Sequence, residues 1–188
     1  MKDSIAKVQN LINLGKYYKA SIILGPLLKK DPNNFQLIQF QFLIFLATND
    51  DINALKTLHL MSKIKENYVV FNNIGNLERK LGNFESAIKN FNKAISLNNT
   101  IPEIYYNLGN VYSQINHTKK AIDFYNKALA LDPEYSSALN NIGAEFLKLE
   151  DLQNARLYIS KALVVDDKKI ETLVNSVLIS IFENDFHP

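Results

Sequence analysis

The stretch that decides the fold is Tyr105–Tyr112, which reads YYNLGNVY. Thirty-four residues earlier, the chain reads FNNIGN over residues 71–76. Thirty-four residues later, it reads LNNIG over residues 139–143. A fixed period of this length predicts stacked helix–turn–helix repeats, in which each unit buries its apolar face against its neighbours.

Small residues recur at fixed places after this stretch. One glycine per repeat falls inside an expected first helix, and two alanines follow in the expected second helix. They are Gly75, Gly109 and Gly143, then Ala87, Ala94, Ala121, Ala128, Ala155 and Ala162. Glycine inside a helix costs about 0.5–1 kcal/mol relative to alanine. We therefore expect the partner helix to pass close by at these positions, with large side chains filling the space between.

The pattern Asn-Leu-Gly…Tyr…Ala…Tyr…Ala…Pro over residues 107–133 resembles the tetratricopeptide repeat (TPR) family. The resemblance covers nearly the whole chain and implies an all-α, right-handed superhelical solenoid. It divides residues 1–188 into a single array with repeats at about 1–34, 35–67, 68–101, 102–135 and 136–169, and an incomplete sixth unit or capping helix at 170–188.

The second repeat departs from the pattern. Its expected first helix has Gln41 and Phe42 where the family has a large apolar residue and a small one. The interval from Ala54 to Ala87 is thirty-three residues, so we expect a loop one residue shorter than the others. We expect Phe40, Leu43 and Leu46 either to form an apolar anchor pocket in the groove or to pack under neighbouring first helices. The second interpretation is preferred.

The sixth unit begins at Ile170 and carries apolar residues on more than one face. We expect its first helix to end near Phe182 and a turn to follow at residues 183–186. Two interpretations stay open: this helix is the cap of the array, or the chain is a fragment of a longer protein. The second is preferred. Left uncovered, the apolar faces predict a homodimer formed through this C-terminal helix, whereas a helix that is an adequate cap would leave the chain a monomer.

Composition excludes several classes of protein. The formal net charge is +2 with no long basic run, which argues against nucleic-acid and membrane-surface binding. The most apolar segment, residues 35–47, is too short to span a bilayer. The chain has no cysteine, so it has no disulfide and no thiolate metal site. We expect a cytoplasmic protein.

The sequence contains no recognisable catalytic constellation. The histidines, His59, His117 and His187, have neither metal-ligand spacing nor an evident serine and acid partner. The recurring glycines lie one per repeat inside helices and do not form a phosphate-binding loop. We therefore predict a non-enzymatic chain without cofactors.

Asparagines form a ladder along the expected first helices. The resemblance implies that these helices line a concave groove, and it puts the residue two before each glycine on that wall. At this slot the chain has Asn73, Asn107, Asn141 and Asn175, and one turn further on it has Asn76 and Asn110. A primary amide can match the N–H and C=O groups of a peptide backbone. A similar ladder lines the TPR region of O-linked N-acetylglucosamine transferases. We expect the remaining contacts on this wall to come from Tyr106, Lys80 and Lys148.

Two alternatives apply to the ladder. Asparagine is common at this slot in TPR sequences, and the chain is rich in asparagine elsewhere, so family habit or compositional bias also explains it. A carboxylate clamp for acidic C-termini is disfavoured, because its cationic places fall on Asn72, Ser137 and Asn141.

The leading hypothesis is a non-catalytic scaffold or adaptor that binds a protein or extended peptide in the groove. The alternative is the substrate-recruiting region of a larger transferase whose catalytic domain lies outside this chain. RNA binding by a helical-repeat code is disfavoured by the thirty-four-residue period and the near-neutral charge.

Overall fold

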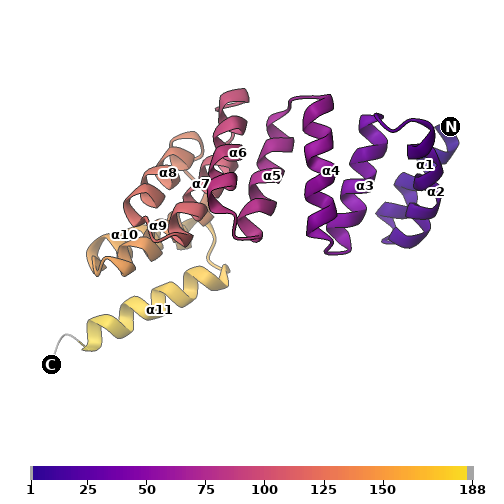
Figure 1. Ribbon diagram of the computed structural model, residues 1–188. Coiled ribbons are helices and arrows are strands. Elements are labelled where there is room, and N and C mark those ends of the chain that lie inside the picture. The colour runs from indigo at the N-terminus through magenta and orange to yellow at the C-terminus, as the bar shows by residue number, and fades with distance from the viewer. Residues whose placement is uncertain (1, 186–188) are drawn as a thin grey trace. The chain divides into compact units, whose positions relative to one another are not determined.

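The computed structural model describes residues 2–185 and shows two compact units, Met1–Leu97 and Asn98–Pro188. The described residues form helices and loops without a strand. Helices of the first unit are α1 (Lys2–Asn13), α2 (Tyr17–Lys30), α3 (Phe35–Ala47), α4 (Asp51–Ile64), α5 (Tyr68–Lys80) and α6 (Phe84–Leu97). Helices of the second unit are α7 (Pro102–Gln114), α8 (Thr118–Leu131), α9 (Ser136–Lys148), α10 (Leu152–Val165) and α11 (Ile170–Asp185) (Figure 1).

Consecutive helices pack as pairs. The closest packing joins α5 to α6, α7 to α8 and α9 to α10. The second helix of a pair also contacts the first helix of the next pair in the same unit, as α4 does with α5 and α8 with α9. This arrangement confirms the predicted all-α fold of helix–turn–helix repeats.

The turn inside each pair contains one residue in the left-handed region. These residues are Gly15, Asn49, Gly82, Asn116 and Glu150, with φ of 69°, 57°, 80°, 59° and 58°. Glycine adopts such a conformation without steric cost, and asparagine does so more easily than most residues. Their intervals are 34, 33, 34 and 34 residues (49−15, 82−49, 116−82 and 150−116). The short interval lies between Asn49 and Gly82, where the sequence predicts the short loop.

The mid-helix glycines lie directly under large side chains of the partner helix. A Cβ atom on Gly109 would come within 2.5 Å of the Tyr125 ring, and one on Gly75 within 2.7 Å of the Phe91 ring. On Gly143 it would come within 2.5 Å of Ile159. The predicted close passage of the partner helix is confirmed. Each glycine makes room for one large side chain of that helix.

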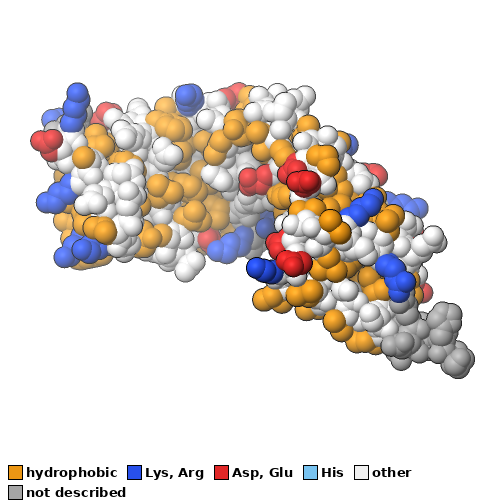
Figure 2. Space-filling model, turned by 180° about the vertical axis from the view of Figure 1, so that it is seen from behind, with side chains coloured by type: hydrophobic (Ala, Val, Ile, Leu, Met, Phe, Trp, Pro, Cys, Tyr) orange, Lys and Arg blue, Asp and Glu red, His pale blue; other side chains and the backbone are white. Residues whose placement is uncertain are grey.

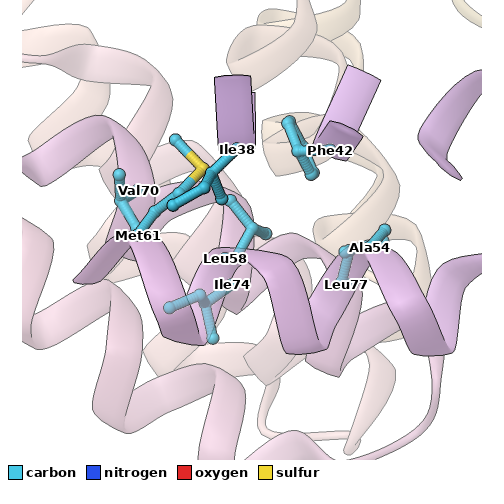
Figure 3. Close-up of a cluster of buried hydrophobic side chains, with 8 residues drawn as sticks. All are labelled: Ile38, Phe42, Ala54, Leu58, Met61, Val70, Ile74 and Leu77. Carbon is cyan, nitrogen blue, oxygen red and sulfur yellow. The ribbon is translucent and has the colours of Figure 1, made fainter. Parts of the chain in front are cut away.

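The degenerate second repeat packs differently. Phe42 of α3 occupies the place of the glycine and is 6% exposed. Opposite Phe42, α4 has Leu58 where α6 has Phe91 and α8 has Tyr125. In this repeat the aromatic ring is therefore on the first helix of the pair and not on the second. Side chains of α3, α4 and α5 meet in this cluster, which comprises Ile38, Phe42, Ala54, Leu58, Met61, Val70, Ile74 and Leu77 (Figure 3).

The last helix, α11, continues to Asp185. The turn expected from residue 183 is therefore wrong for residues 183–185, and Phe186 lies outside the described residues. Thr172 and Ile179 of α11 are buried, and the helix packs on α9 and α10. Its other apolar side chains are exposed: Ile170, Leu173, Val174, Val177, Leu178, Ile181 and Phe182. Figure 2 shows hydrophobic side chains at the surface of the second unit.

Candidate functional site

The amide of Asn141 joins three helices of the second unit. Its Nδ2 on α9 donates to Oδ1 of Asn110 on α7 at 2.9 Å. The same Nδ2 lies 3.3 Å from the hydroxyl of Tyr106 on α7 and 3.4 Å from that of Tyr125 on α8. The Tyr125 hydroxyl in turn donates to Oδ1 of Asn110 at 2.8 Å. The ladder residue of one repeat is thus bonded to the polar side chains of the repeat before it.

The network continues to the next first helix. Nδ2 of Asn175 on α11 donates to Oδ1 of Asn140 at 2.9 Å, and Nδ2 of Asn140 lies 3.4 Å from Oδ1 of Asn141. Donation therefore runs in one direction, from α11 through α9 to α7. In these bonds Asn110 only accepts and Asn175 only donates. These bonds use the Oδ1 of Asn110 and the Nδ2 of Asn175, and the other half of each amide takes no part in them.

Three tyrosines surround this network. The ring of Tyr106 lies 5.8 Å from that of Tyr125 and 5.1 Å from that of Tyr135, centroid to centroid. Burial raises the pKa of Tyr135 to about 12 and also raises the pKa of Tyr125. Both hydroxyls therefore keep their protons near neutral pH, and that of Tyr125 acts as a donor.

Both cations that we expected on the wall are paired with acids. Nζ of Lys80 on α5 lies 2.7 Å from Oδ2 of Asp51 on α4. Nζ of Lys148 on α9 lies 2.5 Å from Oε1 of Glu145 and 3.0 Å from Oγ of Ser113 on α7. Each of the two lysines therefore forms an ion pair within the protein.

The placement of the ladder corrects one expectation. We expected the side chains of Asn107 and Asn141 to project from the concave wall. Asn107 is only 7% exposed, and the Nδ2 group of Asn141 is bonded within the protein. The physical reason is that neighbouring first helices lie close enough for an amide to find a partner there. Asn73, Asn76, Asn110, Asn141 and Asn175 are half-buried.

The apolar residues singled out on α3 have different surroundings. Phe40 is 3% exposed and packs with Val8, Ala20 and Leu37, so it does not form a ligand pocket. Leu43 is partly buried against this cluster, whereas Leu46 is 42% exposed.

The sequence interpretation missed three participants, Glu145, Asn140 and the hydroxyl of Tyr125. A signal for Glu145 was present, because the first helices α3, α5, α7 and α11 have an apolar residue at its position. The histidines His59 and His117 are exposed, and His187 lies outside the described residues. Residues 2–185 contain no cluster of three metal-ligating side chains. No helix in that range combines the length and apolar character needed to cross a membrane.

Comparison with sequence families identifies the repeat. A TPR repeat model matches residues 75–116, and a tetratricopeptide repeat model matches residues 102–135. No curated protein sequence matches the chain.

Solved structures with the same fold cover most of the chain. MamA matches with a TM-score of 0.79 at 23% identity, over 86% of this chain and 95% of MamA. PilF of Pseudomonas aeruginosa matches with a TM-score of 0.79 at 19% identity, over 98% of this chain and 85% of PilF. YrrB, described as a TPR protein with an unusual peptide-binding site, matches with a TM-score of 0.76 at 17% identity, over 92% of this chain and 90% of YrrB. The chain therefore has the fold of tetratricopeptide-repeat proteins, and residues 75–135 carry the sequence repeats themselves.

Proposed function

We propose that the chain is a non-catalytic protein-binding scaffold that holds an extended segment along its first helices. The observation that carries the proposal is the polar row along α7, α9 and α11, where four asparagines and Tyr106 form one hydrogen-bonded network with Tyr125 of α8. A network with its internal bonds satisfied is rigid, so the groups left over are held in place for a ligand.

The leftover groups match a peptide backbone. Asn110 offers amide N–H donors at one end of the row, and Asn175 offers a carbonyl acceptor at the other. A backbone C=O and a backbone N–H of the same extended segment are the complementary groups. Asn73 and Asn76 of α5 are half-buried and supply the equivalent positions in the first unit. The peptide-binding site described for YrrB supports this use of the fold.

Within this proposal the ladder residues have two roles. Asn141 bonds the first helices α9 and α7 to each other, and Asn107 is buried within the wall. Asn110 and Asn175 contact the ligand in the second unit, and Asn73 and Asn76 have the equivalent role within the first unit. Tyr106 contributes a half-buried ring beside Asn110, and Lys80 contributes a charge already oriented by Asp51. Lys148 lies on the same wall, paired with Glu145.

Peptide-array screening followed by affinity measurement tests the proposal. For a captured peptide, Asn110→Ala and Asn175→Ala should each weaken binding by roughly 0.5–1.5 kcal/mol, the net value of one hydrogen bond. Asn126→Ala is the matched control, because Asn126 is exposed on the second helix α8. Equal losses in all three variants, or no captured peptide at all, would contradict the assigned wall.

The exposed apolar face of α11 supports a second interaction, with another copy of the chain. Val177 is 58% exposed and Ile181 is 50% exposed, one turn apart on the same face. Burying such surface is favourable by about 25 cal/mol per Å². A two-fold dimer lets one face cover its own copy.

Light scattering at rising protein concentration tests the dimer. We expect self-association of the unaltered chain and its loss in the double variant Val177→Glu/Ile181→Lys. Ser180→Glu is the control, because it adds a charge at an exposed polar position of the same helix. A monomer at high micromolar concentration would show that α11 is an adequate cap.

A further inference from the structure

Glu145 occupies a position that is apolar in four other first helices, α3, α5, α7 and α11. Counted from the first residue of the helix, the tenth position is Ile44 in α3, Leu77 in α5, Val111 in α7, Glu145 in α9 and Ile179 in α11. All five side chains are buried, and Glu145 is only 2% exposed. A buried carboxylate costs several kcal/mol unless its partners compensate for lost water. An apolar residue would serve packing better, so the acid requires another explanation.

The carboxylate is only half satisfied. Its Oε1 accepts hydrogen bonds from Oγ of Ser113 at 2.5 Å and from Nζ of Lys148 at 2.5 Å. Its Oε2 is enclosed and has no hydrogen-bond partner among the described residues. Such an oxygen is expensive to leave unbonded, particularly when it belongs to a charged group.

Lys148 connects this buried acid to the surface. The Lys148 side chain is 47% exposed, whereas that of Glu145 is 3% exposed. A long flexible lysine can swing into water at little cost, because a half-exposed ion pair contributes little stability. Moving Lys148 would open the carboxylate on the side from which Lys148 now approaches.

We propose that Glu145 is a recognition site for an arginine side chain of the bound protein segment, and that Lys148 occupies this site when no ligand is present. The planar guanidinium offers two parallel N–H groups and can bond both carboxylate oxygens. The ammonium of Lys148 is a compact charge and reaches Oε1 alone. Arginine would therefore satisfy the oxygen that lysine leaves unbonded.

The site lies on the wall proposed to hold the ligand. Ser113 belongs to α7 and lies one turn beyond Asn110, and Glu145 and Lys148 belong to α9. The charge of Glu145 is also felt by the Tyr125 hydroxyl, although burial is the larger cause of the raised pKa of Tyr125. The inference rests on the proposed function for its natural ligand, but the carboxylate itself can be probed with arginine alone.

The test uses short acetylated and amidated Ser/Ala peptides with one central Arg, Lys or norleucine, titrated by NMR. We expect the Arg peptide to bind about ten-fold more tightly than the other two, because only a guanidinium can bond both carboxylate oxygens. Lys148→Met removes the competitor and should tighten Arg-peptide binding several-fold. Glu145→Gln should abolish the preference for Arg, and Glu150→Gln, in the exposed turn after α9, is the control.

A structural role for Glu145 gives different results. If Lys148→Met leaves Arg-peptide binding unchanged or weakens it, the proposed arginine site is wrong. The same follows if the norleucine peptide binds as tightly as the Arg peptide. Should Glu145→Gln not fold, Glu145→Leu installs the residue type of the other helices. This variant is expected to melt at a higher temperature while losing the Arg preference, and a lower melting temperature would mean that Glu145 serves the fold.

The peptide array separates this inference from the proposed function. Captured peptides without arginine enrichment would overturn the arginine site and leave the scaffold function standing. No captured peptide, combined with Glu145-dependent binding of the Arg probe, would overturn the scaffold function and leave the site standing.

Discussion

The helix pairs α5–α6 and α7–α8 share their central packing. In each pair, a mid-helix glycine lies under an aromatic ring, Phe91 over Gly75 and Tyr125 over Gly109. The alanines flanking each ring in the second helix are fully buried in both pairs. This part of the repeat leaves no spare volume, so it admits little variation.

The same two pairs differ near the turn. In α7–α8 the rings of Tyr112 and Phe124 stack at 5.3 Å with an interplanar angle of 4°. In α5–α6 the equivalent residues are Glu78 and Asn90. Glu78 is 7% exposed and accepts hydrogen bonds from Nδ2 of Asn83 at 2.8 Å and from Oγ of Ser86 at 2.9 Å.

The difference shows which contacts the repeat requires. An aromatic stack and a hydrogen-bonded carboxylate can serve the same place, because each leaves its groups satisfied. The glycine and its covering ring have no such substitute in these two pairs. Tyr125 adds one feature that Phe91 lacks, a hydroxyl that ties the core to Asn110 and Asn141.

The largest effect is expected from removing the covering ring. Phe91→Ala and Tyr125→Ala should each lower the free energy of unfolding by about 3–5 kcal/mol, since both create a cavity over a glycine. Urea denaturation measures this loss. Control substitutions at exposed aromatic residues, such as Tyr18→Ala at 79% exposure, should have little effect. A small loss in either ring variant would mean that the two pairs do not share a core.

The next effect comes from filling the alanine slots. Ala121→Leu and the equivalent Ala87→Leu should each destabilise by roughly 1–3 kcal/mol, because a larger side chain overpacks a 0% exposed position. Thermal melting tests this, with Ala130→Leu on the exposed face of α8 as the control. Unchanged melting of the two buried variants would show that the crossings have room to adjust.

A smaller effect is expected from making α7–α8 resemble α5–α6. Tyr125→Phe removes the hydroxyl and its bonds to Asn110 and Asn141, at a net cost of roughly 0.5–1.5 kcal/mol. Asn141→Ala should cost a similar amount, and the double variant less than the sum, because both changes remove part of one network. Strict additivity would show that the hydroxyl and the amide act separately.

These pairs also explain what sequence reasoning could and could not find. The glycines and alanines were recognisable because each packs against a residue at a fixed distance in the same repeat. Asn110, Tyr106 and Tyr125, which bond Asn141, and Ser113, which bonds Glu145, lie in the preceding repeat. Their bonding depends on how side chains from different helices meet. The repeat period carries no information on how those side chains meet, so the sequence did not show that the Asn141 amide is bonded within the protein. Glu145 itself was visible as an acid at an apolar position.

The turns provide the smallest and last comparison. α5–α6 has Gly82 in the left-handed position, α7–α8 has Asn116, and α9–α10 has Glu150, whose φ is 58°. A residue with a Cβ atom pays about 1–2 kcal/mol for this conformation, and asparagine pays less because its side chain can bond locally. Glycine removes this strain, but it also makes the unfolded chain more flexible, which lowers the free energy of unfolding by about 0.5–1 kcal/mol.

Glu150→Gly should therefore stabilise the protein by about 0.5–1 kcal/mol, the difference between relieved strain and lost chain entropy. Asn116→Gly should change the free energy of unfolding little, because the strain relieved at asparagine is about as large as the chain entropy that glycine loses on folding. Urea denaturation of both variants under one set of conditions gives the comparison. Glu150 is exposed, so its replacement removes little packing and isolates the backbone term. If Glu150→Gly instead lowers the free energy of unfolding, the side chain of Glu150 stabilises the protein by more than the backbone strain costs.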